Sequence, residues 1–498
     1  MKLFRKKRTF AWLVATLLLS LVVISGTGFS KTAPKAVSFR VLYDFNLDPK
    51  GMSLTDNKYT QFIRDKTGVQ INIESPGSAA YMNKLNVMMA SGDYPDAFMS
   101  NPREPILQFA EDGMLTDLTP YIKDIKKYPN FKNMPEEAWL PITHKNKIWG
   151  FPYNRQDAFN QVVFVKKEWM KRLGLKTPKT IDEFYEVLKA FREKDPDGNG
   201  KKDTYGLLCN YDLAYGGRIF LSSFDAASYK IINKKVTPPE ITPQYKEYLK
   251  FMNRLVKEGI IDQEFPLFSN PIYREKLKGG IYGMTSNFWH GDQLPEYAQN
   301  RVDEVWEAIP LPVKKDGSPA KFMYSTMNRH YIAVPKTTKN VAALMKMFDW
   351  VLSPEGTRFV YMGVENKEYK ITGGKIEMIE LPHPIHWSFS LVKHGHLSEE
   401  VKNYMSFSRT KDAIERLDFA TKQGQLNNLQ AALPYYPEMS NFNLPNIVSE
   451  YTTKAILGVV DIDATWNDYV SKWRSSGGDK AIAFWTDWYN KYGKKMIK

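Results

Sequence analysis

An acidic loop at residues 195–206, DPDGNGKKDTYG, has the composition and spacing of a calcium site. Oxygen-bearing side chains occupy its first, third, fifth and ninth positions, and Gly200 occupies the sixth, where a calcium loop bends sharply. Calcium takes several carboxylate and carbonyl oxygens at about 2.3–2.6 Å, and alternate residues of a tight loop point toward a common centre. The expected ligands are Asp195, Asp197, Asn199, Asp203 and the main-chain carbonyl of Lys201.

The loop departs from a regular EF-hand at its twelfth position, where Gly206 replaces the usual bidentate glutamate. The residues that follow, TYGLL, have the pattern of a strand, so we expect no exiting helix. A lone loop of this kind suits a structural ion that stays bound, and does not suit a calcium sensor. A metal-free turn rich in aspartate and glycine is the alternative.

The first thirty residues have the layout of an export signal. MKLFRKKR is basic, FAWLVATLLLSLVVI is apolar, and small residues follow as far as Ser30, near which we expect cleavage. The apolar run is shorter than the roughly 20 residues of a membrane-spanning helix, although an uncleaved anchor is the alternative. A bacterial lipoprotein would carry a cysteine after its small residues, whereas this chain has Thr27 there.

Charge and cysteine content narrow the function classes. The formal net charge is +14, and removing the five basic residues of the export signal leaves +9, with no basic run in the rest of the chain. This pattern argues against nucleic-acid binding. Cys209 is the single cysteine, so no intrachain disulfide can form, as is common in exported bacterial proteins. Its apolar surroundings, YGLLCN, predict a buried thiol.

Strands and helices alternate from about residue 36. VSFRVLYDF predicts a first strand, a helix ending at Gly68 follows, and residues 69–73 and 97–99 predict further strands separated by a second helix. This order predicts an α/β fold with a mainly parallel sheet covered by helices on both faces. Thr180 and Glu183 have the spacing of a capping box for a helix just before the acidic loop. Near the C-terminus, an aromatic stripe predicts helix packing through Trp466, Tyr469, Val470 and Trp473.

Several segments together resemble a known family. They are MMASGDYPDAF, KIWGFPY, EGIIDQEFP, DWVLSPEGTRFVYMG, and the stretch from KKEWMKRLGL through the acidic loop. They resemble the extracellular solute-binding proteins, family 1, that deliver oligosaccharides to bacterial ABC importers. The similarity is to the lipoprotein-like branch of Gram-positive bacteria, which is related to calcium-carrying alginate-binding proteins, and it spans about Lys35 to the C-terminus. The missing lipobox cysteine is a departure from that branch.

The resemblance implies a two-lobed periplasmic-binding-protein-like fold of type II, with a ligand cleft between lobes joined by a multi-crossing hinge. We expect a first lobe from residues 36–155 plus about 320–385. The second lobe would comprise residues 156–319 plus about 386–498, including the calcium loop. No Pro/Gly/Ser-rich linker divides the chain, which agrees with several crossings between the lobes.

The resemblance also directs attention to aromatic residues, because sugar rings stack on aromatic faces while polar side chains bind the hydroxyls. Ligands of α/β sheets lie beyond the carboxyl ends of strands, which favours loops that follow strands. Arg155 could pair with a sugar carboxylate. Ordinary core packing is the alternative for each aromatic. The candidate substrate-binding residues are Tyr153, Asn154, Arg155, Trp289, Trp387 and Tyr435.

The predicted function is the extracellular substrate-binding component of an ABC importer, a monomer without catalytic residues that captures an oligosaccharide and delivers it to a membrane permease. The alternative is a secreted calcium-dependent glycan-processing enzyme, which would need two facing carboxylates; Asp292 and Glu365 are candidates, but nothing marks them as a pair. A surface adhesin or sensor would share the binding cleft. A zinc site is a further alternative, at four histidines that match no standard ligand spacing: His383, His386, His394 and His396.

Overall fold

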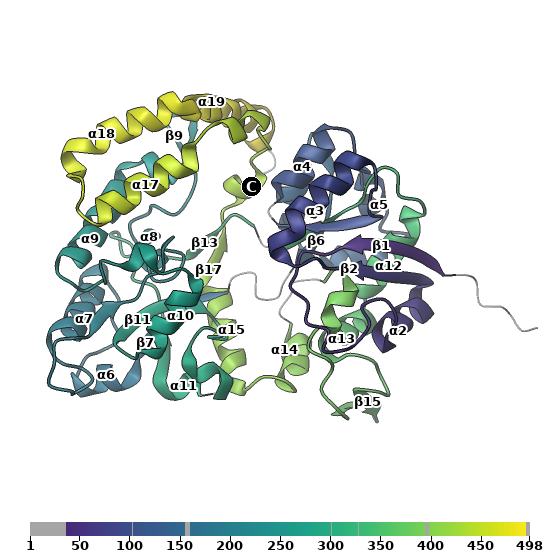
Figure 1. Ribbon diagram of the computed structural model, residues 1–498, viewed down its shortest axis with the longest axis horizontal. Coiled ribbons are helices and arrows are strands. Elements are labelled where there is room, and N and C mark those ends of the chain that lie inside the picture. Colours follow the sequence, from purple (N-terminus) through teal and green to yellow (C-terminus); the bar gives the residue numbers. More distant parts are fainter. Residues whose placement is uncertain are drawn as a thin grey trace, which may run out of the picture.

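The computed structural model describes residues 36–494 except 102, 155–159, 300, 327 and 394–397. The chain forms two α/β lobes that lie side by side (Figure 1). The predicted export signal, Arg155, and two of the clustered histidines, His394 and His396, lie outside the described residues. Among the helices that are described, none is long and apolar enough to cross a membrane.

The first lobe is built on a five-stranded sheet with the order β2-β1-β3-β14-β6. β1 runs parallel to β2 and β3, as the alternating sequence predicted, whereas β14 runs antiparallel to β3 and β6. β14 comes after the four strands of the second-lobe sheet in the sequence, although it pairs with β3 in the first lobe. The strands are β1 (Val37–Leu42), β2 (Val69–Glu74), β3 (Ala97–Ser100), β6 (Phe151–Asn154) and β14 (Asn328–Ala333).

Helices cover both faces of this sheet (Figure 1). α2 begins where the Asn57 side chain accepts the N–H groups of Tyr59 and Thr60, and it ends at Gly68, whose φ of 74° places it in the left-handed region that glycine tolerates best. The helices are α2 (Lys58–Thr67), α3 (Ser78–Ser91), α4 (Glu104–Glu111), α5 (Thr119–Lys123), α12 (Val341–Val351) and α13 (Pro354–Met362).

The second lobe has a four-stranded sheet with the order β12-β7-β11-β8. The prediction of a mainly parallel sheet is wrong here, because β7 is antiparallel to both of its neighbours and only β11 and β8 are parallel. β7 leaves the hinge, while β11 and β12 run back toward it. The strands are β7 (Gln161–Lys166), β8 (Tyr205–Leu207), β11 (Tyr282–Phe288) and β12 (Trp306–Ile309).

The helices of the second lobe confirm two local predictions. Thr180 and Glu183 form the capping box of α7, and Trp466, Tyr469 and Trp473 are buried along α18. α17, α18 and α19 lie together over the end of the lobe (Figure 1). The helices are α6 (Lys167–Arg172), α7 (Ile181–Glu193), α8 (Arg218–Leu221), α9 (Pro243–Lys257), α10 (Asn270–Lys278), α11 (Val302–Val305), α15 (Lys411–Gln423), α17 (Leu444–Ile456), α18 (Ile462–Trp473) and α19 (Asp479–Trp488).

The chain passes between the lobes several times. It leaves the first lobe after β6, returns between β13 (Phe322–Tyr324) and β14, and leaves again toward α14 (Glu399–Ser406). The predicted division assigned the chain from about residue 386 to the second lobe. Phe389, Leu391 and Val392 are instead buried in the core of the first lobe, so this crossing comes later.

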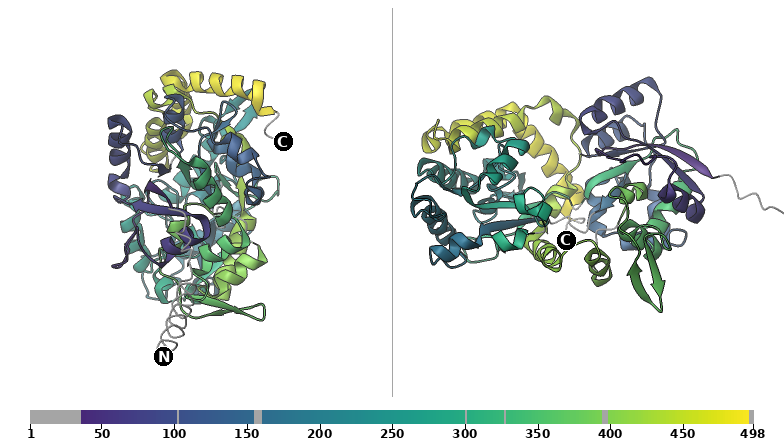
Figure 2. Two further views of the ribbon diagram at one scale, coloured as in Figure 1. Left: turned by 90° about the vertical axis from the view of Figure 1, so that its right-hand side faces the viewer. Right: turned by 60° about the horizontal axis from the view of Figure 1, so that its bottom comes forward.

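Smaller elements complete the lobes and the hinge. β13 pairs with β17 (Gly424–Leu426) beside the hinge, and α16 (Asn428–Ala432) packs against the 3₁₀ helix η2 (Glu136–Ile142) of the first lobe. A hairpin of β15 (Tyr369–Thr372) and β16 (Lys375–Met378) projects from the first lobe (Figure 2). The remaining short strands are β4 (Thr143–His144), β5 (Lys147–Ile148), β9 (Lys230–Ile232) and β10 (Lys235–Thr237).

Candidate functional site: an interlobe cavity

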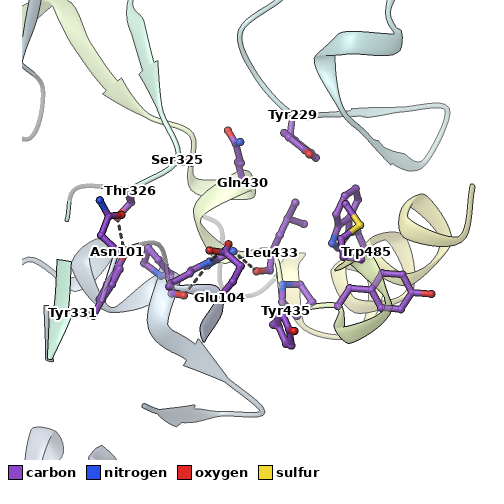
Figure 3. A pocket seen from close by; sticks show the side chains of 15 residues that line it. Asn101, Glu104, Tyr229, Ser325, Thr326, Tyr331, Gln430, Leu433, Tyr435 and Trp485 are labelled. Atoms are coloured by element: carbon purple, nitrogen blue, oxygen red, sulfur yellow. Dashed lines mark hydrogen bonds and ion pairs between the residues drawn. The ribbon is translucent and has the colours of Figure 1, made fainter. Parts of the chain in front are cut away.

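A cavity of 340 Å³, here called the interlobe cavity, is lined by both lobes and by the segments that join them. From the first lobe, Asn101, Arg103 and Glu104 follow the carboxyl end of β3, where ligands of α/β sheets bind. Figure 3 shows Asn101 and Tyr331 on one side of the cavity and Tyr435 and Trp485 on the other. The lining also includes Pro141, Tyr229, Ser325, Thr326, Gln430, Leu433, Pro434, Tyr436 and Met439.

Arg103 ties the wall of this cavity to the first lobe. Its Nη1 donates to the carbonyls of Pro141 at 2.7 Å and Ala431 at 2.9 Å, and its Nη2 donates to the carbonyl of Leu433 at 2.9 Å. A planar guanidinium can serve several acceptors with one rigid fork, which the flexible ammonium of a lysine cannot. Arg103 therefore holds the segment that follows α16 in a defined position beside the cavity.

Tyr435 and Trp485 supply aromatic faces at the cavity. Tyr435 is partly buried, and its hydroxyl donates to Gln108 Oε1 at 2.6 Å, which anchors the ring to α4. Trp485, on α19, is only 6% exposed and makes an edge contact with Tyr229, with ring centroids 5.6 Å apart and planes at 79°. These rings offer the flat apolar surfaces on which the C–H faces of sugars stack.

A second cavity of 630 Å³, here called the second-lobe cavity, continues from the first. The two cavities share Tyr229, Gln430, Met439 and Trp485, so these four residues form the boundary between them. The second-lobe cavity is lined by α8, α9 and α17, and by the segments at residues 211–214, 226–229 and 238–240. Its charged lining residues are Asp212, Arg218 and Glu240.

The acidic loop lies outside both cavities, and its side chains converge on one another. Asp195 accepts the N–H groups of Gly200 at 2.9 Å and of Asn199 at 3.1 Å, and these bonds lower the pKa of its carboxyl. Asn199 Nδ2 donates to Asp197 at 3.0 Å and to Asp203 at 3.2 Å. Burial and the neighbouring carboxylates raise the pKa of Asp197. The amide of Asn199 thus stands as a hydrogen-bond donor between two carboxylates.

The loop meets some of the requirements of a cation site. Three carboxylates and one amide lie within hydrogen-bond reach of one another, and the loop leads directly into β8 as its sequence predicted. Among the described residues, no three histidine, cysteine, aspartate or glutamate side chains are arranged to hold a metal ion. Burial first, and then the nearby carboxylates, raise the pKa of Asp197, as expected where like charges are gathered in one loop.

Comparisons with known proteins identify the fold's family. The sequence profile of the bacterial extracellular solute-binding proteins matches residues 50–358. The chain belongs to this family. Lipoprotein LipO of Bacillus subtilis (strain 168) is 26% identical over 437 residues, which are 84% of this chain and 85% of LipO. The polygalacturonan/rhamnogalacturonan-binding protein YtcQ of the same strain is 27% identical over 434 residues, which are 84% of this chain and 85% of YtcQ.

A solved structure agrees with the two-lobed fold of a solute-binding protein. The Streptococcus pneumoniae ABC-transporter substrate-binding protein FusA, in complex with kestose, is similar with a TM-score of 0.64 at 20% identity. The similarity covers 92% of this chain and 100% of FusA. The predicted fold class is therefore confirmed.

The structure separates the sequence-predicted binding residues of this solute-binding protein. Tyr435 lines the interlobe cavity, whereas Tyr153, Trp289 and Trp387 line neither cavity. Trp289 is 2% exposed in the core of the second lobe, where its carbonyl accepts Nε of Arg416 at 2.9 Å. Its environment matches the core-packing alternative.

Tyr153 and Trp387 meet in the first lobe. Their ring centroids are 6.3 Å apart, and both rings contact Phe45, at 6.2 Å and 5.4 Å. Tyr153 is 2% exposed, while Trp387 is partly buried and donates its Nε1 hydrogen to the carbonyl of Pro384 at 2.8 Å. Asn154 ends β6 opposite Asn328, and its neighbour Arg155 lies outside the described residues.

The zinc and enzyme alternatives gain nothing from the described residues. His386 is buried with its two ring nitrogens 2.9 Å and 3.0 Å from the carbonyls of His383 and Val360, and burial lowers its pKa to about 4. Both ring nitrogens therefore face backbone carbonyls, and one of them donates the single N–H of the neutral ring. Asp292 follows β11 in the second lobe and Glu365 follows α13 in the first, and neither lines the two cavities.

Sequence reasoning missed Arg103, Tyr229, Glu240 and Trp485. Arg103 could have been found, because NPRE directly follows the predicted strand at residues 97–99, the same rule that selected Asn154. Trp485 belongs to an aromatic-rich C-terminal stretch that resembles a packing helix. Its position at the cavity depends on contacts between segments more than 200 residues apart, such as the edge contact with Tyr229.

Proposed function

We propose that this solute-binding protein is the exported substrate-binding component of an ABC importer, and that it captures an oligosaccharide at the interlobe cavity for delivery to a membrane permease. The observation that carries the proposal is a cavity between two lobes that combines aromatic faces with hydrogen-bonding side chains. Tyr229, Tyr435 and Trp485 provide the faces, and Asn101 and Gln430 provide amide groups. This combination suits a sugar, which presents apolar ring faces and hydroxyl edges.

The names of the relatives agree with a carbohydrate ligand. YtcQ is named for binding polygalacturonan and rhamnogalacturonan, and the FusA structure contains kestose. The multi-crossing hinge allows the lobes to close on a ligand held between them, and Arg103 supports one wall of the cavity from the first lobe. We propose a monomer without enzymatic activity.

Calorimetric titration of the mature protein with a panel of oligosaccharides tests this function. Saturable binding, with the sugar recovered intact by mass spectrometry, is the expected result. Small-angle scattering should show a smaller radius of gyration in the presence of the ligand, because the lobes close. Consumption of the sugar during titration would contradict the proposal and favour the glycan-processing enzyme.

A structural calcium ion in the acidic loop is a second proposal. The calcium ion would be held by Asp195, Asp197, Asn199, Asp203 and the main-chain carbonyl of Lys201. It would replace the hydrogen bonds through which Asn199 now separates the carboxylates, and it would join the end of α7 to the start of β8. Titration of the EDTA-treated, dialysed protein with calcium should give one site per chain and a higher melting temperature. An unchanged melting temperature at saturating calcium would contradict the structural role.

A further inference from the structure

The two cavities are lined by more acidic than basic residues, although the chain as a whole is strongly basic. Although the chain carries +14, the charged residues lining the cavities are three acidic and two basic. Both basic groups are directed to backbone carbonyls: Arg103 as described above, and Arg218 to the carbonyl of Met323 at 2.5 Å. Arg218 also lies over the ring of Tyr324, 5.2 Å from its centroid. These guanidinium groups therefore have partners of their own.

Glu240 is the carboxylate that stays uncompensated. It is the middle residue of the short 3₁₀ helix η3 (Pro239–Ile241), which precedes α9, and it lines the second-lobe cavity. Within the described part of the chain, no lysine, arginine or histidine forms an ion pair with it. Its own backbone N–H offsets only part of the effect of burial, which raises its pKa. The other acidic residue there, Asp212, is held locally by the N–H of Ala214 at 3.1 Å.

Four tyrosines, Tyr211, Tyr229, Tyr245 and Tyr248, line the same cavity as Glu240. The charge of Glu240 contributes to raising the pKa values of Tyr229 and Tyr245, after the larger effect of burial. The hydroxyl of Tyr245 is paired with Thr452 Oγ1 at 2.8 Å, so it is engaged elsewhere. Glu240 thus lines a cavity with aromatic walls, and its carboxylate oxygens can accept hydrogen bonds from the hydroxyl groups of a ligand.

From this arrangement we infer that the second-lobe cavity accepts a sugar unit without a carboxylate, whose hydroxyl groups donate hydrogen bonds to Glu240, and that it excludes uronates. The inference rests on the proposed function, because it names the sugar class for the same continuous site. Tyr229 and Trp485, which line both cavities, would stack on the sugar as it passes from one cavity to the other.

Repulsion provides the selectivity. A uronate would bring a second carboxylate beside Glu240 in a partly desolvated cavity, where like charges are costly, while the guanidinium of Arg218 is held at the Met323 carbonyl. A neutral hexose instead offers several hydroxyl donors to a charged acceptor, which makes stronger hydrogen bonds than a neutral acceptor. The positive net charge of the chain would then concern its surface and not its ligand.

The test compares one sugar pair that differs only at the hydroxymethyl groups, which are carboxylates in the second sugar. The tightest neutral hexopyranose oligosaccharide of the panel is paired with its counterpart in which the hydroxymethyl groups are oxidised to carboxylates. Both are titrated into the full mature protein over a series of increasing pH values, because burial raises the pKa of the Glu240 carboxyl and the selectivity requires its ionised form. We expect the wild type to bind the neutral sugar at least about tenfold more tightly than the uronate.

Glu240→Gln keeps the size of the side chain and removes its charge. It should weaken neutral-sugar binding by about tenfold, through loss of charged hydrogen bonds, and leave uronate binding equal or stronger. Glu247→Gln, which removes the same charge from the exposed face of α9, should change neither affinity. Melting curves of both variants establish that they fold.

The outcomes separate the two hypotheses. Tighter binding of the uronate by the wild type, or equal losses for both sugars in Glu240→Gln, would overturn the inference while leaving sugar binding intact. If no oligosaccharide of either kind binds, the proposed function itself fails. A preference for the neutral sugar that persists undiminished in Glu240→Gln would assign selectivity to another residue and would also overturn the inference.

Discussion

The acidic loop and the second-lobe cavity both gather carboxylates, but they stabilise them differently. In the loop, Asp195 and Asp197 receive N–H donors from residues only a few positions along the chain. In the cavity, Glu240 shares the lining with residues from distant segments, such as Thr452 and Trp485, and neither of these is a cation. One region compensates its charge with the local backbone, and the other keeps an acceptor available for a ligand.

The difference predicts that the two regions are functionally independent. A calcium ion in the loop should affect the stability of the second lobe, whereas substitutions at the cavity should affect the affinity for the oligosaccharide. The loop belongs to the connection between α7 and β8, while the cavities are lined by other elements. Substitutions in the loop should therefore leave oligosaccharide affinity unchanged, and substitutions at the cavity should leave calcium affinity unchanged. Four predictions test this separation.

The largest effect is expected in the loop. Asp195→Ala should lower calcium affinity on the order of 100-fold, because the affinity of calcium loops depends on the number of charged ligands. Oligosaccharide affinity should change by less than about twofold, since sites without shared partners behave additively. Calorimetry with calcium and with sugar measures both. Asp182→Ala, at an exposed position in the first turn of α7, is the control. Loss of sugar binding in folded Asp195→Ala would show that the regions are coupled.

The cavity should show the opposite behaviour. Trp485→Ala should weaken oligosaccharide binding roughly thirtyfold, or by about 2 kcal/mol, as for other central tryptophans of binding sites. Calcium affinity should stay unchanged. Because Trp485 is buried, Trp485→Phe is measured beside it to preserve folding, with a smaller expected loss. Trp488→Ala, one turn further along and outside both cavities, serves as the matched control. Equal losses in Trp485→Ala and Trp488→Ala would indicate general destabilisation.

The same contrast explains what could be predicted from the sequence. The capping box of α7 and the glycine that ends α2 each depend on residues within a few positions, so their spacing was sufficient. The cavities form where elements that are distant in the sequence pack together, among them β3, α9, α16 and α19. Short-range sequence patterns do not predict such packing. Tyr435, which was selected from a proline-flanked aromatic segment, lines the interlobe cavity. Trp289, in an equally plausible loop after β11, is buried in the core.

The antiparallel pairing of β7 was missed for a related reason. The strand–helix alternation of the first lobe predicts parallel pairing, and β1, β2 and β3 follow it. The direction of β7 depends on the chain having crossed the hinge before entering the second sheet, and its local sequence carries no sign of this crossing. The resemblance to a two-lobed family supplied what periodicity could not.

A moderate effect is expected where the two lobes meet. Arg103→Lys should weaken sugar binding by roughly tenfold, because one ammonium cannot serve both the Ala431 and Leu433 carbonyls, and about 1–2 kcal/mol of positioning is lost. Hydrogen exchange should increase at residues 428–436, which distinguishes lost positioning from lost ligand contact. Arg301→Lys, exposed on the second lobe, is the control. Unchanged exchange together with weaker binding would show that Arg103 contacts the ligand directly.

The smallest effect concerns the pH dependence of the loop. Burial and the nearby carboxylates raise the pKa of Asp197, so in the absence of calcium this group takes up a proton at a higher pH than an ordinary aspartate. Because calcium requires the ionised carboxylate, its affinity should fall as the pH is lowered through this raised pKa, and proton release should accompany binding. Calorimetry in buffers of different ionisation enthalpy measures that release as the pH is lowered through the acidic range. Asp197→Asn should abolish it, whereas Glu240→Gln should leave it unchanged, because Glu240 belongs to the cavity and takes no part in the loop. Proton release that persists in Asp197→Asn would show that another group carries the proton. It would also weaken the contrast between the loop, whose carboxylates accept hydrogen bonds from the nearby backbone, and the cavity, whose carboxylate is available to a ligand.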